Sequence, residues 1–127
     1  MSDNYSVTIR DTSRELTLRE RIRIKDTGCC VKMEDILSAG EKLEIPFDGY
    51  AMLDVHNEKA NPVDYENIVV FAKDGTCYRT GSPTFIRTFL DIYSEICDYP
   101  GEEYSIGAVY QESKNYKGKN FIRAILL

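Results

Sequence analysis

The chain has 127 residues, of which 43% are hydrophobic and 29% charged, a balance that fits one folded domain and excludes a disordered chain. No apolar run approaches the roughly 18 residues of a membrane span, and the first ten residues lack a signal peptide's apolar stretch, so we expect a cytoplasmic protein outside the membrane. The net charge of −5 by itself argues against a nucleic-acid partner.

The first quarter of the chain is polar and predicts short elements. Residues 1–18 predict an N-terminal arm or an edge strand, and residues 19–127 the main domain. Residues 21–25 alternate strictly, which predicts a strand with Ile22 and Ile24 inward and with three cations outward, Arg21, Arg23 and Lys25. A turn is expected next, at 26–28. One or two helical turns follow over 31–37 and end near Gly40.

Residues 42–56 carry the clearest two-residue period in the chain. One face of this strand would hold the apolar residues Leu43, Ile45, Phe47, Ala51, Leu53 and Val55. The other face would hold Glu44, Asp48, Tyr50, Met52, Asp54 and His56. Pro46 and Gly49 interrupt the run and predict an edge position, a bulge or a sharp bend. A long, bent strand that serves two parts of one sheet is typical of small closed barrels.

The second half of the chain predicts a hairpin, one helix and two final strands. Asp74 and Gly75 join the β-rich runs 68–72 and 76–80, which predicts a type I′ hairpin turn. Ser82 and Pro83 open a helix that runs to about Cys97. Its apolar face consists of Phe85, Ile86, Phe89, Leu90, Tyr93 and Ile96. Strands over 104–110 and 120–127 complete the chain.

This order of elements predicts the fold class. The chain should be mainly β, an oligonucleotide-binding (OB)-like barrel of five to six strands, with one α-helix between the central hairpin and the last two strands. The sequence contains no internal repeat and no low-complexity tract.

Catalytic and metal chemistry find little support in the sequence. The chain has a single histidine, His56, and no glycine-rich phosphate loop, so we expect neither an enzyme nor a cofactor. The four cysteines, at positions 29, 30, 77 and 97, do not form the Cys-x-x-Cys arrangement that holds zinc. We expect reduced, mostly buried thiols and no metal.

Charge is segregated along the chain. Residues 10–25 hold six bases and three acids, residues 104–127 hold four bases and one acid, and residues 91–103 hold five acids and no base. Such segregation is typical of a protein that binds a polyanion on one side. Random clustering on a solvated surface is the alternative.

Two groups of residues predict the binding surface. The segment 113–119 combines a tyrosine with three lysines, Lys114, Tyr116, Lys117 and Lys119, as a single-strand binder would to stack bases and neutralise phosphates. Strand parity adds Arg21, Arg23 and Tyr50 as outward-facing residues, and the end of the central hairpin adds Tyr78 and Arg79. The sequence leaves open whether Tyr50, Met52 and His56 line this surface or belong to a second core packed by the helix.

Two blocks of the sequence carry a family resemblance. The block 68–78, with Phe71-Ala72-x-Asp74-Gly75 leading to Tyr78, and the passage 113–121, with Ser113, Gly118 and Phe121, resemble the single-stranded DNA-binding proteins of small Bacillus phages with protein-primed replication. The resemblance implies a phage or mobile-element protein that coats displaced single strands in the host cytoplasm. It implies DNA contacts at Tyr78, Lys114, Lys117 and Lys119.

The sequence therefore predicts sequence-nonspecific binding of single-stranded DNA. Replication proteins are a further candidate class of partner, and the oligomeric state is left open. The main alternative is an acidic phage accessory protein that contacts or inhibits a host enzyme, based on the acids of 91–103 and the net charge. RNA binding is a second alternative, since rings and cations bind either backbone.

Overall fold

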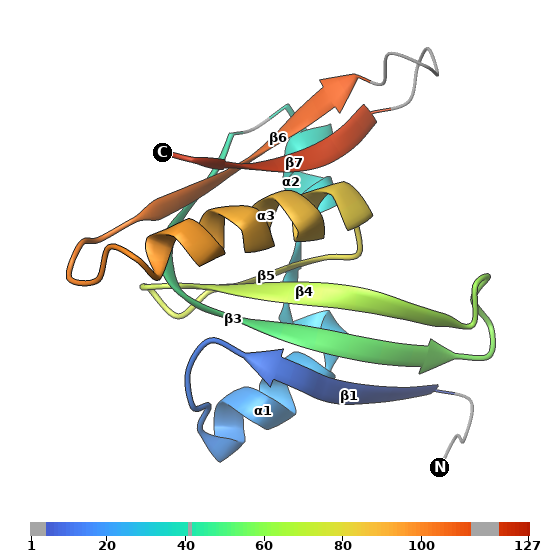
Figure 1. The fold of residues 1–127 in the computed structure, drawn as a ribbon. Coiled ribbons are helices and arrows are strands. Elements are labelled where there is room, and N and C mark those ends of the chain that lie inside the picture. The colour runs from blue at the N-terminus through green and yellow to red at the C-terminus, as the bar shows by residue number, and fades with distance from the viewer. Residues whose placement is uncertain (1–4, 41, 113–119) are drawn as a thin grey trace.

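The computed structural model describes residues 5–40, 42–112 and 120–127. The chain runs through β1 (Tyr5–Thr12), α1 (Leu18–Lys25), a 3₁₀ turn (Thr27–Cys29), β2 (Val31–Lys32), α2 (Met33–Ser38), β3 (Leu43–Asn57), β4 (Asp64–Ala72), β5 (Cys77–Thr80), α3 (Pro83–Ile96), β6 (Ser105–Glu112) and β7 (Asn120–Leu126). Over these residues the strands form one sheet in the order β2-β5-β4-β3-β6-β7, with β1 paired to β3. The fold is mainly β, and its sheet curls into half a barrel (Figure 1). No helix in the described ranges has the length and hydropathy needed to cross a membrane.

Strand β3 is the long, bent strand that the sequence predicts. Its first residues, 43–46, pair with β6, whereas the rest pairs with β4 on one edge and β1 on the other. A bulge separates the two parts, because Phe47 pairs with Ala72 while Gly49 pairs with Phe71, which leaves Asp48 as an extra residue. Strand β1, which pairs with β3, lies within residues 1–18, for which the sequence predicts an arm or an edge strand.

The bulge reverses the side-chain alternation along β3. Residues 43, 45 and 47 pack into the core under α3, and beyond the bulge Tyr50 and Met52 join the same core. Ala51, Leu53 and Val55 pack on the opposite face of the sheet. The prediction that all six odd-numbered apolar residues share one face is therefore wrong. Tyr50, which is 6% exposed, is likewise not an outward-facing residue; with Met52 it belongs to the core packed by the helix, the alternative that the sequence left open.

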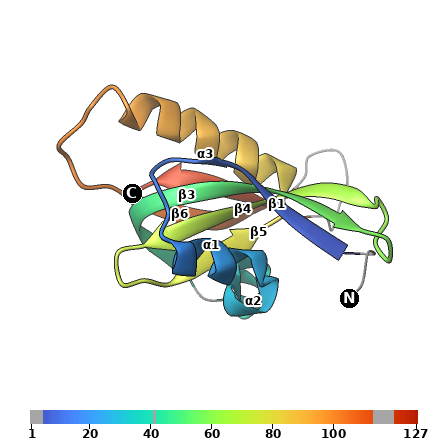
Figure 2. The ribbon, with the colours of Figure 1, turned by 90° about the horizontal axis from the view of Figure 1, so that it is seen from below.

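The sheet is covered on both faces by different helices. Helix α3 lies on one side and α1 on the other (Figure 2). Phe85 and Phe89 of α3 are fully buried, as the apolar spacing predicts, and Ser82 caps the helix by accepting a hydrogen bond from the Phe85 amide. On the opposite face, Ile24 of α1 packs into the second core beside Val69 and Phe71.

Residues 21–25 form the end of helix α1 and not the predicted strand. The helix starts at a capping box: the Thr17 hydroxyl accepts from the Glu20 amide at 3.2 Å, and the Glu20 carboxylate accepts from the Thr17 amide at 2.9 Å. Ile24 is buried, but Ile22 is 61% exposed, so the prediction that both isoleucines point inward is also wrong. The short helical turn predicted before Gly40 is confirmed as α2.

The β4–β5 hairpin is confirmed, but its turn is of another type. Gly75 has a φ of +93°, whereas no other residue type in the described ranges has a positive φ, so Asp74 cannot occupy a type I′ position. The Gly75 amide donates to the Ala72 carbonyl at 3.0 Å, and the Ala72 amide donates to the Thr76 carbonyl at 2.9 Å. These bonds form a three-residue loop that ends on a glycine with positive φ.

Helix α3 occupies the free edge of β7. The Ala124 amide donates to the Thr88 hydroxyl at 2.9 Å, and the Ser82 hydroxyl donates to the Ile122 carbonyl at 3.3 Å. Closing the sheet into a full barrel would require a strand at this edge. Here the Thr88 and Ser82 hydroxyls bond to the β7 backbone groups that such a strand would pair with, and the sheet remains a half-barrel.

Candidate nucleic-acid interface

The structure divides the predicted binding residues between several places. Lys114, Tyr116, Lys117 and Lys119 lie outside the described residues, between β6 and β7, and their role stays a prediction. Tyr50 leaves the candidate surface because it is buried under α3. The remaining four lie on two elements, Arg21 and Arg23 on α1 and Tyr78 and Arg79 on β5.

Tyr78 and Arg79 do not share a surface. Tyr78 pairs with Val70 and packs partly buried against the core under α3, whereas Arg79 pairs with Val69 on the other side of the sheet. The positive charges of Arg79 and Arg23 both influence the pKa of the Cys30 thiol. A hydrogen bond with the Cys77 sulfur and burial raise the pKa of Cys30, and the two arginines oppose this rise.

All four cysteines are free thiols; Cys30 and Cys77 are buried, but Cys29 and Cys97 are exposed, so burial is confirmed for only two of them.

His56 lies at the far end of β3 and does not extend a stacking surface. Its Nδ1 is 2.7 Å from an Asp64 carboxylate oxygen, and its Nε2 is 3.1 Å from a Glu58 carboxylate oxygen. The hydrogen bonds to Asp64 and then Glu58 raise the pKa of His56 above its usual value. The ring is thus held between two acids on the surface, where anionic DNA would be repelled.

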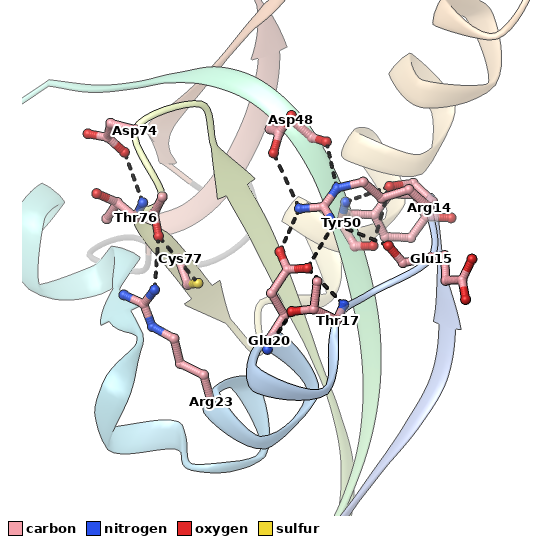
Figure 3. A network of polar contacts seen from close by, with 12 residues as sticks. Arg14, Glu15, Thr17, Glu20, Arg23, Asp48, Tyr50, Asp74, Thr76 and Cys77 are labelled. Atoms are coloured by element: carbon pink, nitrogen blue, oxygen red, sulfur yellow. Dashed lines mark hydrogen bonds and ion pairs between the residues drawn. The ribbon is translucent and has the colours of Figure 1, made fainter.

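A polar network anchors α1 to the bulge of β3 (Figure 3). The Arg14 guanidinium donates to both carboxylate oxygens of Glu20, at 3.1 and 2.8 Å, and to the Asp48 backbone carbonyl at 3.2 Å. It also lies 5.1 Å from the centre of the Phe71 ring. The hydrogen bond from Arg14, followed by that from the Thr17 amide, lowers the pKa of Glu20 from 4.5 to about 2. The direction of α1 is therefore fixed by charge-assisted bonds.

This network predicts a pH-dependent contribution to stability. Because the pKa of Glu20 is lower in the folded state, its contribution is present above pH 4.5 and is lost as the pH falls toward 2. We expect Glu20→Gln, which keeps an acceptor for the Thr17 amide, to lower the free energy of unfolding at pH 7 by about 1 kcal/mol, since solvent screens a pair that is about 30% exposed. Urea titrations at pH 7 and pH 2.5 should show this difference shrinking. Glu15→Gln, at an exposed acid, is the control, and an equal loss at both pH values would contradict the assignment.

The β6–β7 hairpin carries an outward face that the sequence analysis did not single out. Its inner side is apolar and buried, at Ile106, Ala108, Ile122 and Ala124. Its outer side pairs Val109 with Arg123 and Gln111 with Phe121, and all four are exposed. A ring and a guanidinium thus lie two residues apart on the strand that follows the lysine-rich segment 113–119. The alternation of residues 120–126 could have identified both residues.

A groove of about 440 Å³ adjoins this hairpin. Leu37 of α2, Lys42 before β3, and Val109 and Ile125 of the hairpin contribute to its wall. Tyr110 also lines it, and its hydroxyl lies 3.0 Å from the Ser38 hydroxyl. The groove is mainly apolar and has both a cation, Lys42, and an anion, Glu44, in its lining; its apolar wall is suited to an unstacked base.

A comparison of the chain with protein-family models, with curated proteins and with solved structures finds no match.

Proposed function

We propose that this protein binds single-stranded DNA with little sequence preference, through the outer face of the β6–β7 hairpin and the segment 113–119 between its strands. The observation that carries the proposal is the exposed pair Phe121 and Arg123 directly after that segment. The ring would stack on bases, while Arg123 and the three lysines would neutralise phosphates. Arg21 and Arg23 are not included, because α1 lies on the other side of the half-barrel (Figure 1).

The strand order supports an OB-like fold as part of this proposal. If β3 is taken as the first strand of an OB barrel, β4 and β5 are the second and third, and β6 and β7 are the fourth and fifth. Helix α3 then falls between the third and fourth strands. The segment 113–119 becomes the connection between strands four and five, one of the loops through which OB barrels contact oligonucleotides.

The test is a fluorescence-anisotropy titration with a labelled oligo-dT of about 30 nucleotides at low and moderate salt. We expect saturable binding that weakens with salt, because phosphate contacts release counterions. Phe121→Ala should weaken binding about 5- to 150-fold at every salt concentration, which corresponds to about 1–3 kcal/mol for one stacked base. Arg123→Ala should lower the salt dependence by about one phosphate contact.

Two control variants match these changes. Tyr5→Ala removes a ring that is 40% exposed, against 39% for Phe121, and Arg87→Ala removes an exposed arginine on α3. Both should bind as the wild type does. A folded protein that fails to bind at low salt would overturn the proposal, and equal losses in test and control variants would exclude the hairpin as the site. Competition with a matched RNA oligonucleotide separates DNA from RNA binding.

By the resemblance to phage proteins, the protein would coat displaced single strands during phage or mobile-element replication, in the host cytoplasm and beside replication proteins. One observation favours the alternative function, contact with a host enzyme: Asp91 and Glu95 line a second groove, beside α3. A host protein recovered by pull-down after nuclease treatment, together with absent DNA binding, would favour this alternative.

A further inference from the structure

Helix α1 presents two apolar side chains to solvent. Leu18 is 73% exposed and Ile22 is 61% exposed, and the two lie one helical turn apart. Three exposed cations belong to the same helix, Arg19, Arg21 and Lys25. Among the described residues, the ion pairs involve none of these cations. Exposed apolar residues surrounded by charge are typical of a surface that contacts another protein.

The helix is held rigidly enough to act as a docking element. Its capping box, the Arg14–Glu20 pair and buried Ile24 fix its start and its inner face. Arg23 fixes the other end by donating to the Gly75 carbonyl at 3.2 Å (Figure 3). Little backbone ordering would therefore be left to oppose association, and the cost of ordering falls on the exposed side chains of the helix.

A groove of about 260 Å³ beside α3 has the complementary character. Its apolar wall includes Ile92 and Ile96, also one helical turn apart, and Leu126 of β7. Asp91 and Glu95 contribute two exposed carboxylates. Neither acid takes part in an ion pair within the described ranges.

We propose that α1 of one copy docks into this groove of a second copy, so that the protein self-associates head to tail. Leu18 and Ile22 would pack against Ile92 and Ile96, pairing apolar residues of equal spacing on two helices. The cations of α1 would meet the carboxylates of the groove. A second copy is the occupant that the structure favours, because both complementary surfaces belong to this chain.

The position of the two surfaces determines the type of assembly. Helices α1 and α3 cover opposite faces of the sheet (Figure 2). One pair of copies therefore uses one α1 and one groove and leaves the others free, and such a heterologous contact adds further copies until it closes as a ring or extends as a chain. The proposed contact centres on two apolar side chains from each copy, which predicts weak association at high micromolar concentration. It needs no DNA and is independent of the proposed function.

The test is sedimentation velocity of the full chain without nucleic acid, from about 5 to 500 μM, at low and moderate salt. We expect the average mass to rise with concentration and the rise to weaken with salt. The variant L18S/I22S alters only exposed side chains of α1, and D91K/E95K reverses the charges of the groove. Each alone should raise the dissociation constant at least tenfold. The variant E15K/D35K reverses two other exposed acids and should associate at least as well as the wild type.

Mixing the two interface variants gives the decisive result. One retains an intact groove and the other an intact α1, so an equimolar mixture should form dimers that do not grow further. A wild type that stays monomeric at all concentrations would overturn the proposal. Two variants that each lose self-association but do not pair when mixed would overturn it as well, because a single contact between α1 and the groove requires that pairing.

Discussion

Replacing Phe89 with alanine should lower the free energy of unfolding by about 3–5 kcal/mol, a large part of the total stability of a small domain. Phe89 is fully buried at the centre of the aromatic cluster under α3. Its ring centre lies 5.7 Å from that of Phe47, 5.3 Å from that of Tyr50 and 5.9 Å from that of Phe85. Phe47 and Tyr50 lie on either side of the bulge in β3, so this ring joins both parts of the strand to α3.

Urea unfolding followed by circular dichroism measures this effect. Phe89→Leu, which keeps most of the apolar volume, should cost clearly less than Phe89→Ala. Leu18→Ala removes a side chain that is exposed and should stay within about 0.5 kcal/mol of the wild type. A loss below about 1 kcal/mol for Phe89→Ala would mean that α3 does not pack on β3 as described.

The loss of α3 packing should also disturb the proposed DNA-binding strand, β7. Thr88 and Ser82 of the α3 region hold the free edge of β7 through Ala124 and Ile122. Phe121 and Arg123 alternate with these edge residues along the same strand. A destabilised α3 should therefore weaken DNA binding beyond the fraction of unfolded protein.

Helix α3 and the β4–β5 hairpin could be predicted because their signals are local and agree with one another. Ser82 and Pro83 mark the start of the helix, and the apolar spacing of 85–96 identifies its buried face. Asp74 and Gly75 mark a turn whatever its type. In each case the residues that determine the element lie within one short window.

Helix α1 was predicted wrongly because five alternating residues fit a strand as well as a helix. The deciding signal lies outside that window, in the capping box of Thr17 and Glu20. The same error misplaced the cations, because an alternating strand would align Arg21, Arg23 and Lys25 on one face. The net charge of the segment follows from the sequence alone, but the directions in which its charged side chains point depend on whether the segment is a helix or a strand.

The binding surface was partly misassigned because side-chain direction along β3 depends on one residue. A strand alternates with a period of two, so a single inserted residue moves every later side chain to the other face. Pro46 and Gly49 indicate an interruption of the strand, but the sequence does not show how many extra residues the resulting bulge contains. The extra residue Asp48 therefore moved Tyr50 from the expected DNA face into the core.

Gly49→Ala is expected to destabilise the protein by about 2–4 kcal/mol, since two costs act at the bulge. Gly49 has a φ of +151°, a conformation that costs an L-residue about 1–3 kcal/mol. A methyl group there would also lie 2.9 Å from the Ser13 hydroxyl and 3.1 Å from the Arg14 guanidinium. Ser13 must then move, although its hydroxyl accepts from the Tyr50 amide at 2.8 Å and its own amide donates to the Tyr50 carbonyl at 3.0 Å. Weakening these bonds adds about 1 kcal/mol.

Gly40→Ala separates the two costs in the same urea assay. Gly40 has a φ of +79° but open space around the position of a Cβ, so only the backbone strain of about 1–2 kcal/mol applies. The difference between the two variants measures the contacts with Ser13 and Arg14. In the background of Ser13→Ala, which removes the clashing hydroxyl together with its bond, Gly49→Ala should cost less than it does alone. An equal loss of stability for both glycine variants in either background would contradict the contact between the loop before α1 and the bulge. The direction of α1, which head-to-tail docking requires, would then not be fixed by this contact.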